Sequence, residues 1–382
     1  LSLALAAIML IGMMVVSASA VSYNDLTDKD QIVNKDAVSM LVSLGIIEGK
    51  PDGSYAPTEN VDRAQMAKML SVIMNKGVDN SALYQSVNSG LVDVNTNWAK
   101  GHINYCYTTG IIAGRGNGKF DPSATVTALE AAKMLLVAVG YDPAIEGFEG
   151  ADWAINVSVR ADEQGIFEGF TKDLSAPLNR DDAALLIYNA LDVEMIQSYT
   201  TNNYPIVYSD HRTILSDKYG VIKVEGVVTA NEWAILDDDT DTALQEGKTR
   251  IYNPDGILST TGNTAVAQDS SANVKTQVFN VSTPVDMLGK AVTMYVKKTT
   301  ILADSTVYGA PVVSDVNTVI ETGEKVTGGD SKDDDSLAAL LKGTGLATDK
   351  ATEYYHNYEE VAIDSADVDD IMNVKGAALT VI

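Results

Sequence analysis

Arg63 and Arg180 are the side chains best placed for chemistry, because each follows a predicted helix cap, Asp62 or Asn179, by one position. A helix N-terminus carries partial positive charge, so a cation there is unfavourable by up to about 1 kcal/mol. A helix start and a guanidinium together suit an anion, and arginine binds a carboxylate through two parallel hydrogen bonds. Two interpretations therefore stand: an anion site, or a surface arginine paired with a neighbouring acid such as Asp181.

Two tryptophans could supply an apolar surface beside such a site. Trp98 and Trp153 each stand 12 residues before a glycine that should end a helix, and Val33 holds the corresponding place earlier in the chain. A tryptophan that opens a short helix usually belongs to the core. A partly exposed one can stack on the apolar face of a sugar ring.

The elements that position these side chains come from three copies of one pattern. Each copy has Gly-Ile-Ile or Gly-Ile-Phe, a variable residue and Gly, at 45–49, 110–114 and 165–169, followed by a turn and an amphipathic stretch. The offset from the first glycine to the apolar residue that opens this stretch is 16 in the first two copies and 13 in the third. Because one pair of short helices cannot bury a core, we predict three helix–loop–helix units that pack together.

The second helix of each copy has a predicted capping signal at its start. The paired cap and third helical positions are Asp62 with Gln65, Thr127 with Glu130, and Asn179 with Asp182. Gly110 should end the first helix of its copy, because glycine adopts positive φ freely.

The composition excludes several classes of protein. The formal net charge is −25 and is spread over both halves, so nucleic acid and anionic lipid are not expected partners. The single cysteine, Cys106, rules out disulfides within the chain and lies in a predicted apolar helical face. The three histidines share no metal spacing, and no motif of a hydrolase or phosphate-binding loop occurs. We therefore expect no catalytic residues, no metal site and no cofactor.

Both ends of the sequence suggest processing or truncation. An uncharged apolar run at 1–16 and the residues Ser-Ala-Ser-Ala at 17–20 predict a secretory signal peptide cut after Ala20. The run is too short for a comfortable membrane span, and no later segment could span a bilayer. The chain begins at Leu1 and ends within a predicted strand at Ile382, so we expect that both ends are truncated.

The second half has the pattern of a β protein. Short β-rich runs occur at 221–228, 233–236, 249–252, 277–281, 291–296 and 318–320, separated by turn residues, as in an all-β sandwich or small barrel. The acidic runs at 237–241 and 333–335 could supply oxygen ligands for Ca²⁺, but they lack the glycine and distal glutamate of an EF-hand loop. Solvated acidic turns are the alternative interpretation.

The first half of the chain resembles the S-layer homology family. The repeat of that family contains, in order, aromatic-x-Asp-Val, Trp-Ala, Gly-Ile-x-x-Gly, Gly-x-Phe-x-Pro and a helix start of the type Thr-Arg-Ala-Glu. The first copy supplies 23–26, Gly45, Gly49, 53–55, Pro57 and 62–65; the second supplies 92–94, 98–99, Gly110, Gly114, 118–120, Pro122 and 127–130; the third supplies 153–154, Gly165, Gly169, Pro177 and 179–182. The resemblance covers residues 21–195.

The resemblance implies a three-pronged, pseudo-threefold α-helical module that attaches non-covalently to secondary cell-wall polysaccharide, often bearing pyruvate ketals, outside Gram-positive-type bacteria. The family's ligand-binding basic residue maps to Arg63 and Arg180, and its aromatic partner maps to Trp98 and Trp153. The expected polysaccharide-binding set also includes Gly49, Gly114, Gly169 and Arg115.

The chain departs from the family pattern in each copy. Ala128 stands where the second copy should have arginine, Val33 replaces the tryptophan of the first copy, and the third copy has a shortened loop with Asp173 in place of a glycine. Arg115 could compensate for the lost cation, or be a solvated loop charge.

We predict a multidomain α + β protein, with a three-repeat α-helical module followed by an all-β region. The predicted order is a signal peptide at 1–20, repeats at 21–78, 88–140 and 150–195, a linker at 196–218, a β-rich domain at 219–325, a flexible linker at 326–350 and the start of a further β-rich segment at 351–382. The predicted function is a secreted, non-catalytic surface protein held on anionic secondary cell-wall polysaccharide, with self-association in a surface layer as a further expectation. The alternative is a wall-anchored hydrolase whose catalytic domain lies beyond the C-terminus.

Overall fold

The computed structural model describes residues 23–236, 243–254, 275–297 and 306–314, and two short strands at 355–356 and 359–360. The chain divides into two compact units, Leu1–Tyr208 and Ser209–Ile382. The predicted signal peptide, the predicted strand at 318–320, both acidic runs and the predicted linker at 326–350 lie outside the described residues, as does most of 351–382. Among the described residues, no helix combines the length and apolar character that crossing a membrane requires.

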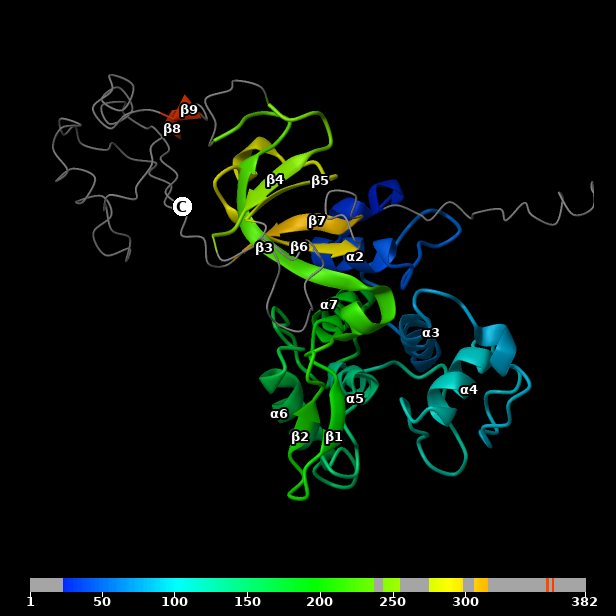
Figure 1. Cartoon of the computed structure of the whole chain (residues 1–382). Coiled ribbons are helices and arrows are strands. Elements are labelled where there is room, and N and C mark those ends of the chain that lie inside the picture. The colour runs from blue at the N-terminus through cyan, green and yellow to red at the C-terminus, as the bar shows by residue number, and fades with distance from the viewer. Residues whose placement is uncertain are drawn as a thin grey trace, which may run out of the picture. The chain divides into compact units, whose positions relative to one another are not determined.

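The first unit is built from outer and inner helices, one pair per copy (Figure 1). The outer helices are α2 (Lys35–Ser43), α4 (Lys100–Thr108) and α6 (Trp153–Glu163), and the inner helices are α3 (Arg63–Met74), α5 (Ala128–Val139) and α7 (Arg180–Leu191). Short 3₁₀ turns lie at η1 (Tyr23–Asp25), η2 (Lys29–Gln31) and η3 (Ser81–Tyr84).

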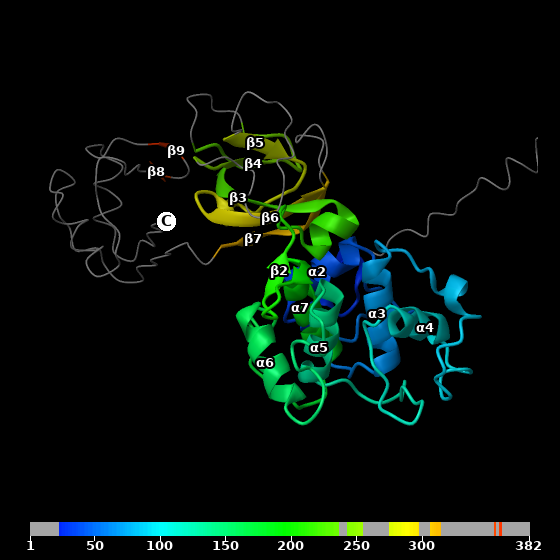
Figure 2. The same ribbon diagram turned by 60° about the horizontal axis from the view of Figure 1, so that its bottom comes forward.

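Each outer helix packs on the inner helix of the preceding copy. Helix α4 packs on α3, α6 packs on α5, and α2 returns from the start of the chain to pack on α7 (Figure 2). The inner helix α5 also contacts both α3 and α7. The first and third copies are therefore joined directly, and the three copies close into a ring.

A cycle of three backbone hydrogen bonds lies where the inner helices begin. The Val61 N–H donates to the Leu178 carbonyl (2.8 Å), the Leu178 N–H to that of Val126 (2.8 Å), and the Val126 N–H to that of Val61 (2.9 Å). All three residues are buried. Since each copy donates to one neighbour and accepts from the other, the ring is pseudo-threefold, as predicted.

The predicted caps are confirmed. Asp62 and Thr127 form reciprocal capping boxes with Gln65 and Glu130, and the Asn179 side chain accepts a hydrogen bond from the backbone of the third helical residue. The glycines after the outer helices have positive φ, namely Gly45 at 69°, Gly110 at 81° and Gly165 at 69°. These local signals fix where the helices start and stop.

The segment predicted as a linker at 196–218 begins instead with a hairpin. Strand β1 (Ile196–Tyr199) pairs antiparallel with β2 (Pro205–Val207). The Ile196 carbonyl lies 2.8 Å from where a Cβ at Gly140 would be, so only glycine allows β1 to approach the end of α5 this closely. The Tyr199 hydroxyl accepts from the Asp142 N–H and donates to Glu146 (3.0 Å). The hairpin therefore belongs to the first unit.

The second unit contains one five-stranded antiparallel sheet in the order β5-β4-β3-β6-β7. Its strands are β3 (Val221–Ala230), β4 (Thr249–Tyr252), β5 (Thr276–Phe279), β6 (Ala291–Lys297) and β7 (Val307–Val313), with η4 (Leu215–Tyr219) before β3 and η5 (Val285–Met287) before β6. Alternate residues of β3 and β6, with Phe279 and Leu288, form its core. Strands β3 to β7 thus form a single sheet.

Four of the predicted strands are confirmed as β3, β4, β5 and β6, and β7 was not predicted. The prediction of a strand at 233–236 is wrong. Asn231 Oδ1 accepts hydrogen bonds from the N–H groups of Trp233 (2.9 Å) and Ala234 (3.2 Å), which bends the chain there. Only an isolated bridge joins Ile235 to Ala230. The short strands β8 (Tyr355–His356) and β9 (Glu359–Glu360) pair with each other.

Candidate functional site

The candidate site residues lie where each inner helix begins against the loop of the next copy. We call these places the first junction (α3 with the second copy's loop), the second junction (α5 with the third copy's loop) and the third junction (α7 with the first copy's loop). At each one, a loop carbonyl accepts from the N–H of the second helical residue. The pairs are Ala64 with Pro122 (2.9 Å), Leu129 with Leu174 (3.1 Å) and Asp181 with Pro57 (3.1 Å).

These bonds change the prediction that the helix starts attract an anion. The first N–H of α3 donates to Ala124 and that of α7 donates to Glu59, while the cap side chains take the third N–H. The helix N-termini at the first and third junctions are therefore already satisfied by protein oxygens. Any anion there would depend on side chains.

The same bonds correct the motif assignment of the third copy. Leu174 occupies the place of Pro57 and Pro122, whereas Pro177 forms a bridge with Thr127. Because the third loop is three residues shorter, Leu174 holds this place, and Pro177, which the motif matched, does not.

A second correction concerns the acidic residue near the start of each copy. Asp93 accepts from the N–H groups of Phe120 (2.9 Å) and Asp121 (2.8 Å). In the first copy this role belongs to Asp28, which accepts from Tyr55 and Ala56 (both 2.7 Å), rather than to Asp25 as the motif suggested. These aspartates hold the aromatic ring on which an arginine of another copy rests.

Arg63 at the first junction is buried and connects the first copy to the second. It is 4% exposed, and it donates from Nε to the Phe120 carbonyl (2.8 Å) and from Nη2 to the Ala113 carbonyl (2.9 Å). Its Cζ lies 4.3 Å from the centroid of the Phe120 ring. Burial, and then the nearby charge of Arg115, lower the pKa of Arg63 to about 10. The guanidinium therefore fastens α3 to the next loop.

Arg180 at the third junction repeats this geometry with more exposure. It donates from Nε to the Tyr55 carbonyl (2.8 Å) and from Nη2 to the Glu48 carbonyl (3.3 Å), and it is half-buried. Its Cζ lies 4.8 Å from the Tyr55 ring centroid, and the Tyr55 hydroxyl donates to the Arg180 carbonyl (2.8 Å). Asp181 is not its partner, because that carboxylate accepts from Asn34 (2.9 Å). Within the part of the chain that the structure describes, neither Arg63 nor Arg180 has a carboxylate within 4.0 Å.

The second junction has lost this contact and replaced part of it. Ala128 stands at the arginine position and Lys172 at the aromatic one. The carbonyl of Glu168, which corresponds to the arginine acceptors Ala113 and Glu48, accepts instead from Asn189 Nδ2 (2.9 Å). An amide from the same copy thus satisfies a carbonyl that elsewhere binds a guanidinium.

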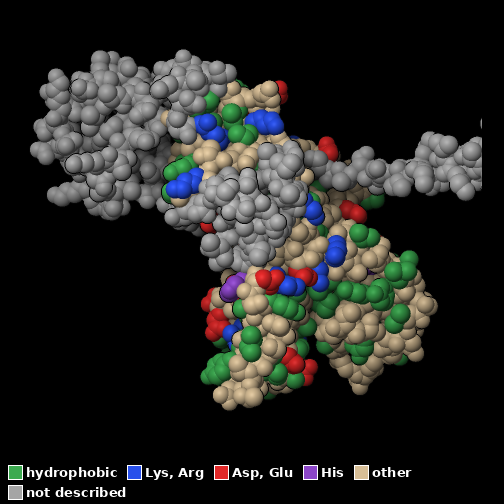
Figure 3. Space-filling view, viewed as in Figure 1, with side chains coloured by type: hydrophobic (Ala, Val, Ile, Leu, Met, Phe, Trp, Pro, Cys, Tyr) green, Lys and Arg blue, Asp and Glu red, His purple; other side chains and the backbone are tan. Residues whose placement is uncertain are grey.

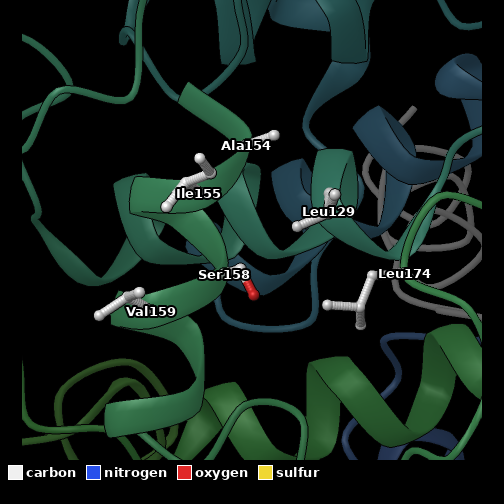
Figure 4. A pocket seen from close by; sticks show the side chains of 6 residues that line it. All are labelled: Leu129, Ala154, Ile155, Ser158, Val159 and Leu174. Atoms are coloured by element: carbon white, nitrogen blue, oxygen red, sulfur yellow. The ribbon is translucent and has the colours of Figure 1, made fainter. Parts of the chain in front are cut away.

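An open apolar groove lies at the second junction, between α6 and the start of α5 (Figure 4). Its volume is about 300 Å³, and it is lined by Leu129, Ala154, Ile155, Ser158, Val159 and Leu174. No lining residue carries a charge, and Ser158 is the one lining residue with a polar side chain.

The tryptophans are distributed differently from the arginines. Because α4 packs on α3, Trp98 belongs to the first junction with Arg63, and by the same rule Trp153 belongs to the second and Val33 to the third. Arg180 and Trp153, both in the third copy, therefore lie at different junctions. Trp98 is 58% exposed.

Trp98 and Arg63 nevertheless do not form one compact site. The Cys106 thiol contacts the Ala67 carbonyl (3.4 Å) and the His102 ring contacts Ser71 (2.5 Å), so α4 runs antiparallel to α3. Trp98 precedes His102 by one turn, whereas Ser71 already lies about 12 Å along α3 from Arg63 at 1.5 Å per residue.

A contact between lysine and tryptophan, which the sequence did not predict, lies at the second junction. Lys133 Nζ lies 5.8 Å from the centroid of the Trp153 ring and donates to the Phe148 carbonyl (2.6 Å). Burial lowers the pKa of Lys133, and Glu149 acts in the opposite direction. The sequence feature that could have drawn attention to Lys133 is Ala-Lys-Met-Leu, which the first two copies share at 67–70 and 132–135.

The remaining predicted site residues shape the loops. A Cβ at Gly114 would lie 2.9 Å from the Lys119 carbonyl, a Cβ at Gly49 would lie 3.2 Å from Leu26, and Gly169 has a φ of 73°. Arg115 is paired with Glu130 (2.7 Å) beside Arg63, so its charge is partly neutralised.

Cys106 is buried, and burial raises its pKa, which suits a core residue. Within the described ranges, no group of three or more His, Cys, Asp or Glu side chains could hold a metal ion.

Comparison with known proteins agrees with this architecture. The family model of the S-layer homology domain matches residues 22–67 and 92–132. A cell surface protein of Thermoanaerobacter kivui is 29% identical over 253 residues, which is 65% of this chain and 30% of that protein. An S-layer protein of Bacillus licheniformis is 32% identical over 113 residues (30% of this chain, 12% of that protein).

Enzymes share the similarity as well. The exoglucanase XynX of Acetivibrio thermocellus is 29% identical over 188 residues, or 45% of this chain and 16% of that protein. The chain thus spans less than a third of the length of each of these three relatives.

Proposed function

From the premise that residues 22–67 and 92–132 are S-layer homology domains, we propose that this chain is a secreted, non-catalytic surface protein. Its first unit binds an anionic secondary cell-wall polysaccharide, and the third junction is the principal contact. The observation that carries this proposal is Arg180: its Nε and Nη2 are fixed by two loop carbonyls, while its charge has no carboxylate partner among the described residues.

The half-buried position of Arg180 favours binding over a purely structural role. Two carbonyl contacts hold the guanidinium without neutralising it, so the side chain does not have to be ordered when a ligand arrives. Lys50, in the same loop, adds a second cation, although Glu59 pairs with it. A carboxylate on the polysaccharide, such as a pyruvate ketal, is the group that such a fixed guanidinium binds best.

The extent of the similarity favours the surface-protein role. The alignment with the cell surface protein covers 253 residues, more than the 208 of the first unit, so it reaches into the β unit. The 188 residues aligned with the exoglucanase could all fall within the first unit. A wall-anchored hydrolase is the second candidate, and the exoglucanase is the observation that favours it.

Wall sedimentation tests the proposal. The chain should sediment with purified cell walls and remain in solution when the secondary polymer has been stripped from them. Arg180→Ala should reduce the bound fraction, whereas Arg63→Ala should change binding much less per folded molecule, because Arg63 occupies the same structural position but is 4% exposed. Equal binding to stripped and intact walls contradicts the proposal.

A further inference from the structure

The lobe that carries α4 has a surface unlike the rest of this acidic molecule. We define the neutral lobe as residues 82–110, which comprise part of η3, α4 and the chain between them. Every exposed residue from Ala82 to Gly110 is uncharged. The lobe contains one acidic residue, Asp93, and one lysine, Lys100, and both are half-buried.

The corresponding surfaces of the other copies are charged. Helix α2 exposes Lys35 and Asp36, and α6 exposes Asp162 and Glu163. Figure 3 shows hydrophobic and other uncharged side chains together over α4, with acidic and basic side chains on other parts of the first unit. The absence of exposed charge is therefore a property of the neutral lobe and not of the repeat.

The neutral lobe also exposes large apolar side chains among amides and hydroxyls. Leu83 is 72% exposed, Val92 is 65% exposed and Trp98 is 58% exposed. Surfaces that are poor in charge and rich in aromatic and amide side chains are typical of the centre of protein–protein interfaces.

Internal contacts hold this surface in shape. The buried Asn104 donates from Nδ2 to the carbonyls of Tyr84 and Val87 (both 2.9 Å) and accepts from the Ser89 hydroxyl (2.7 Å). A Cβ at Gly101 would lie 2.1 Å from the Ser81 carbonyl, so η3 sits directly on α4. A surface ordered in advance loses little conformational entropy when it binds.

We propose that the neutral lobe is a docking surface for a second copy of this chain, which meets it through the same lobe about a twofold axis. Charge selects this partner. Two copies of a protein with a net charge of −25 repel each other on most approaches, and the repulsion is weakest where the surface has no charge. An anionic polymer finds only half-buried Lys100 there, and a cationic partner is drawn more strongly to the acidic surfaces elsewhere.

Sedimentation velocity on the whole chain, over a series of protein and salt concentrations, tests the proposal. The chain should show a concentration-dependent dimer, and salt should strengthen it because salt screens the repulsion between the two copies. A monomer under all conditions overturns the proposal, and so does a dimer that salt weakens, since that behaviour indicates an interface built from ion pairs.

A matched pair of variants locates the surface. Val92→Glu places two like charges in the twofold contact and should raise the dimer dissociation constant about tenfold or more. Val159→Glu introduces the same charge at an exposed valine of α6 and should leave the constant unchanged. Equal effects of the two substitutions overturn the assignment. A monomeric chain that binds soluble cello-oligosaccharides through Trp98 would assign the lobe to a neutral glycan instead.

The two proposals fail separately. Val92→Glu should change the amount of dimer seen in sedimentation velocity, and Arg180→Ala should change the fraction of the chain bound to intact walls. Loss of one property with the other preserved identifies which of the two proposals is wrong.

Discussion

The first and second junctions both join an inner helix to the loop of the next copy, but different side chains donate to the loop carbonyls. At the first, Arg63 binds two carbonyls of the next loop and rests on Phe120. At the second, Ala128 makes no such contact, and Asn189 takes over one of the carbonyls from within its own copy. The hydrogen-bond cycle of the ring is kept at both. The ring therefore constrains the backbone, while the side chains that reinforce each junction are free to diverge.

The largest effect should follow removal of the first-junction arginine. Arg63→Ala leaves two carbonyls without their charged donor and removes the ring contact, so we expect a loss of about 3 kcal/mol in the free energy of unfolding. Urea unfolding of the first unit measures it. Arg63→Lys should recover only part of the loss, because an ammonium cannot reach both carbonyls as the planar guanidinium does.

A smaller loss is expected at the third junction. Arg180 makes the same two kinds of bond, but it is half-buried and its Nη2 contact is longer (3.3 Å against 2.9 Å). Arg180→Ala should therefore cost about 2 kcal/mol in the same urea experiment. If it costs more than Arg63→Ala, then exposure does not separate the two junctions as we describe.

The second junction can be weakened through its substitute donor. Asn189→Ala frees the Glu168 and Ile166 carbonyls, one of which is exposed, so the expected loss is about 1 kcal/mol. Thermal unfolding of the variant measures it. A change below the error of the measurement would mean that water replaces the amide without cost, and that this junction depends on the hydrogen-bond cycle alone.

The smallest effect should be a pH dependence that arises where α4 packs on α3. His102 is buried against Ser71 of α3, with Asp79 at 3.6 Å, Lys68 nearby and the Trp98 ring on its edge. The corresponding positions of the other outer helices are Ala37 and Val157, which do not titrate. Of the three packed pairs of outer and inner helices, only α4 with α3 has a histidine at this position.

Burial lowers the pKa of His102 below its usual value of 6.5, and Asp79 opposes this shift. The unfolded chain then binds the proton more readily, so stability present above pH 6.5 is lost as the pH falls below that value. His102→Gln should lose less stability than the wild type between pH 7.5 and 5.5, as urea unfolding at each pH would show. A parallel decline of both proteins contradicts this role.

Local features of the fold could be predicted because their causes are local. The caps at Asp62 and Thr127 and the positive φ of Gly110 depend on residues a few positions away. The strand at 233–236 could not be excluded, since the bend depends on how one side chain, that of Asn231, is used. The hairpin at 196–207 depends on a close approach to Gly140, more than fifty residues earlier.

The candidate site was predictable in its residue types but not in its geometry. The partners of Arg180 are backbone carbonyls 125 and 132 residues away. Because every residue has a backbone carbonyl, the sequence does not show which ones accept. The pairing of tryptophans with arginines depends on which copies pack together, so the sequence could not show that Arg180 and Trp153 of the third copy lie at different junctions. Asn189 lies in an inner helix where valine stands in the other copies, a difference that becomes meaningful only beside Ala128.

The central claim, that Arg180 holds an acidic sugar of the wall polymer, is tested most directly by titrating the released polysaccharide into the wild-type chain, Arg180→Ala and Arg115→Ala. Arg115 is the matched control because it is an exposed loop cation already paired with Glu130. The account predicts at least a tenfold loss of affinity for Arg180→Ala and a loss of less than about threefold for Arg115→Ala, with both variants folded. Equal affinities of the two variants would contradict it.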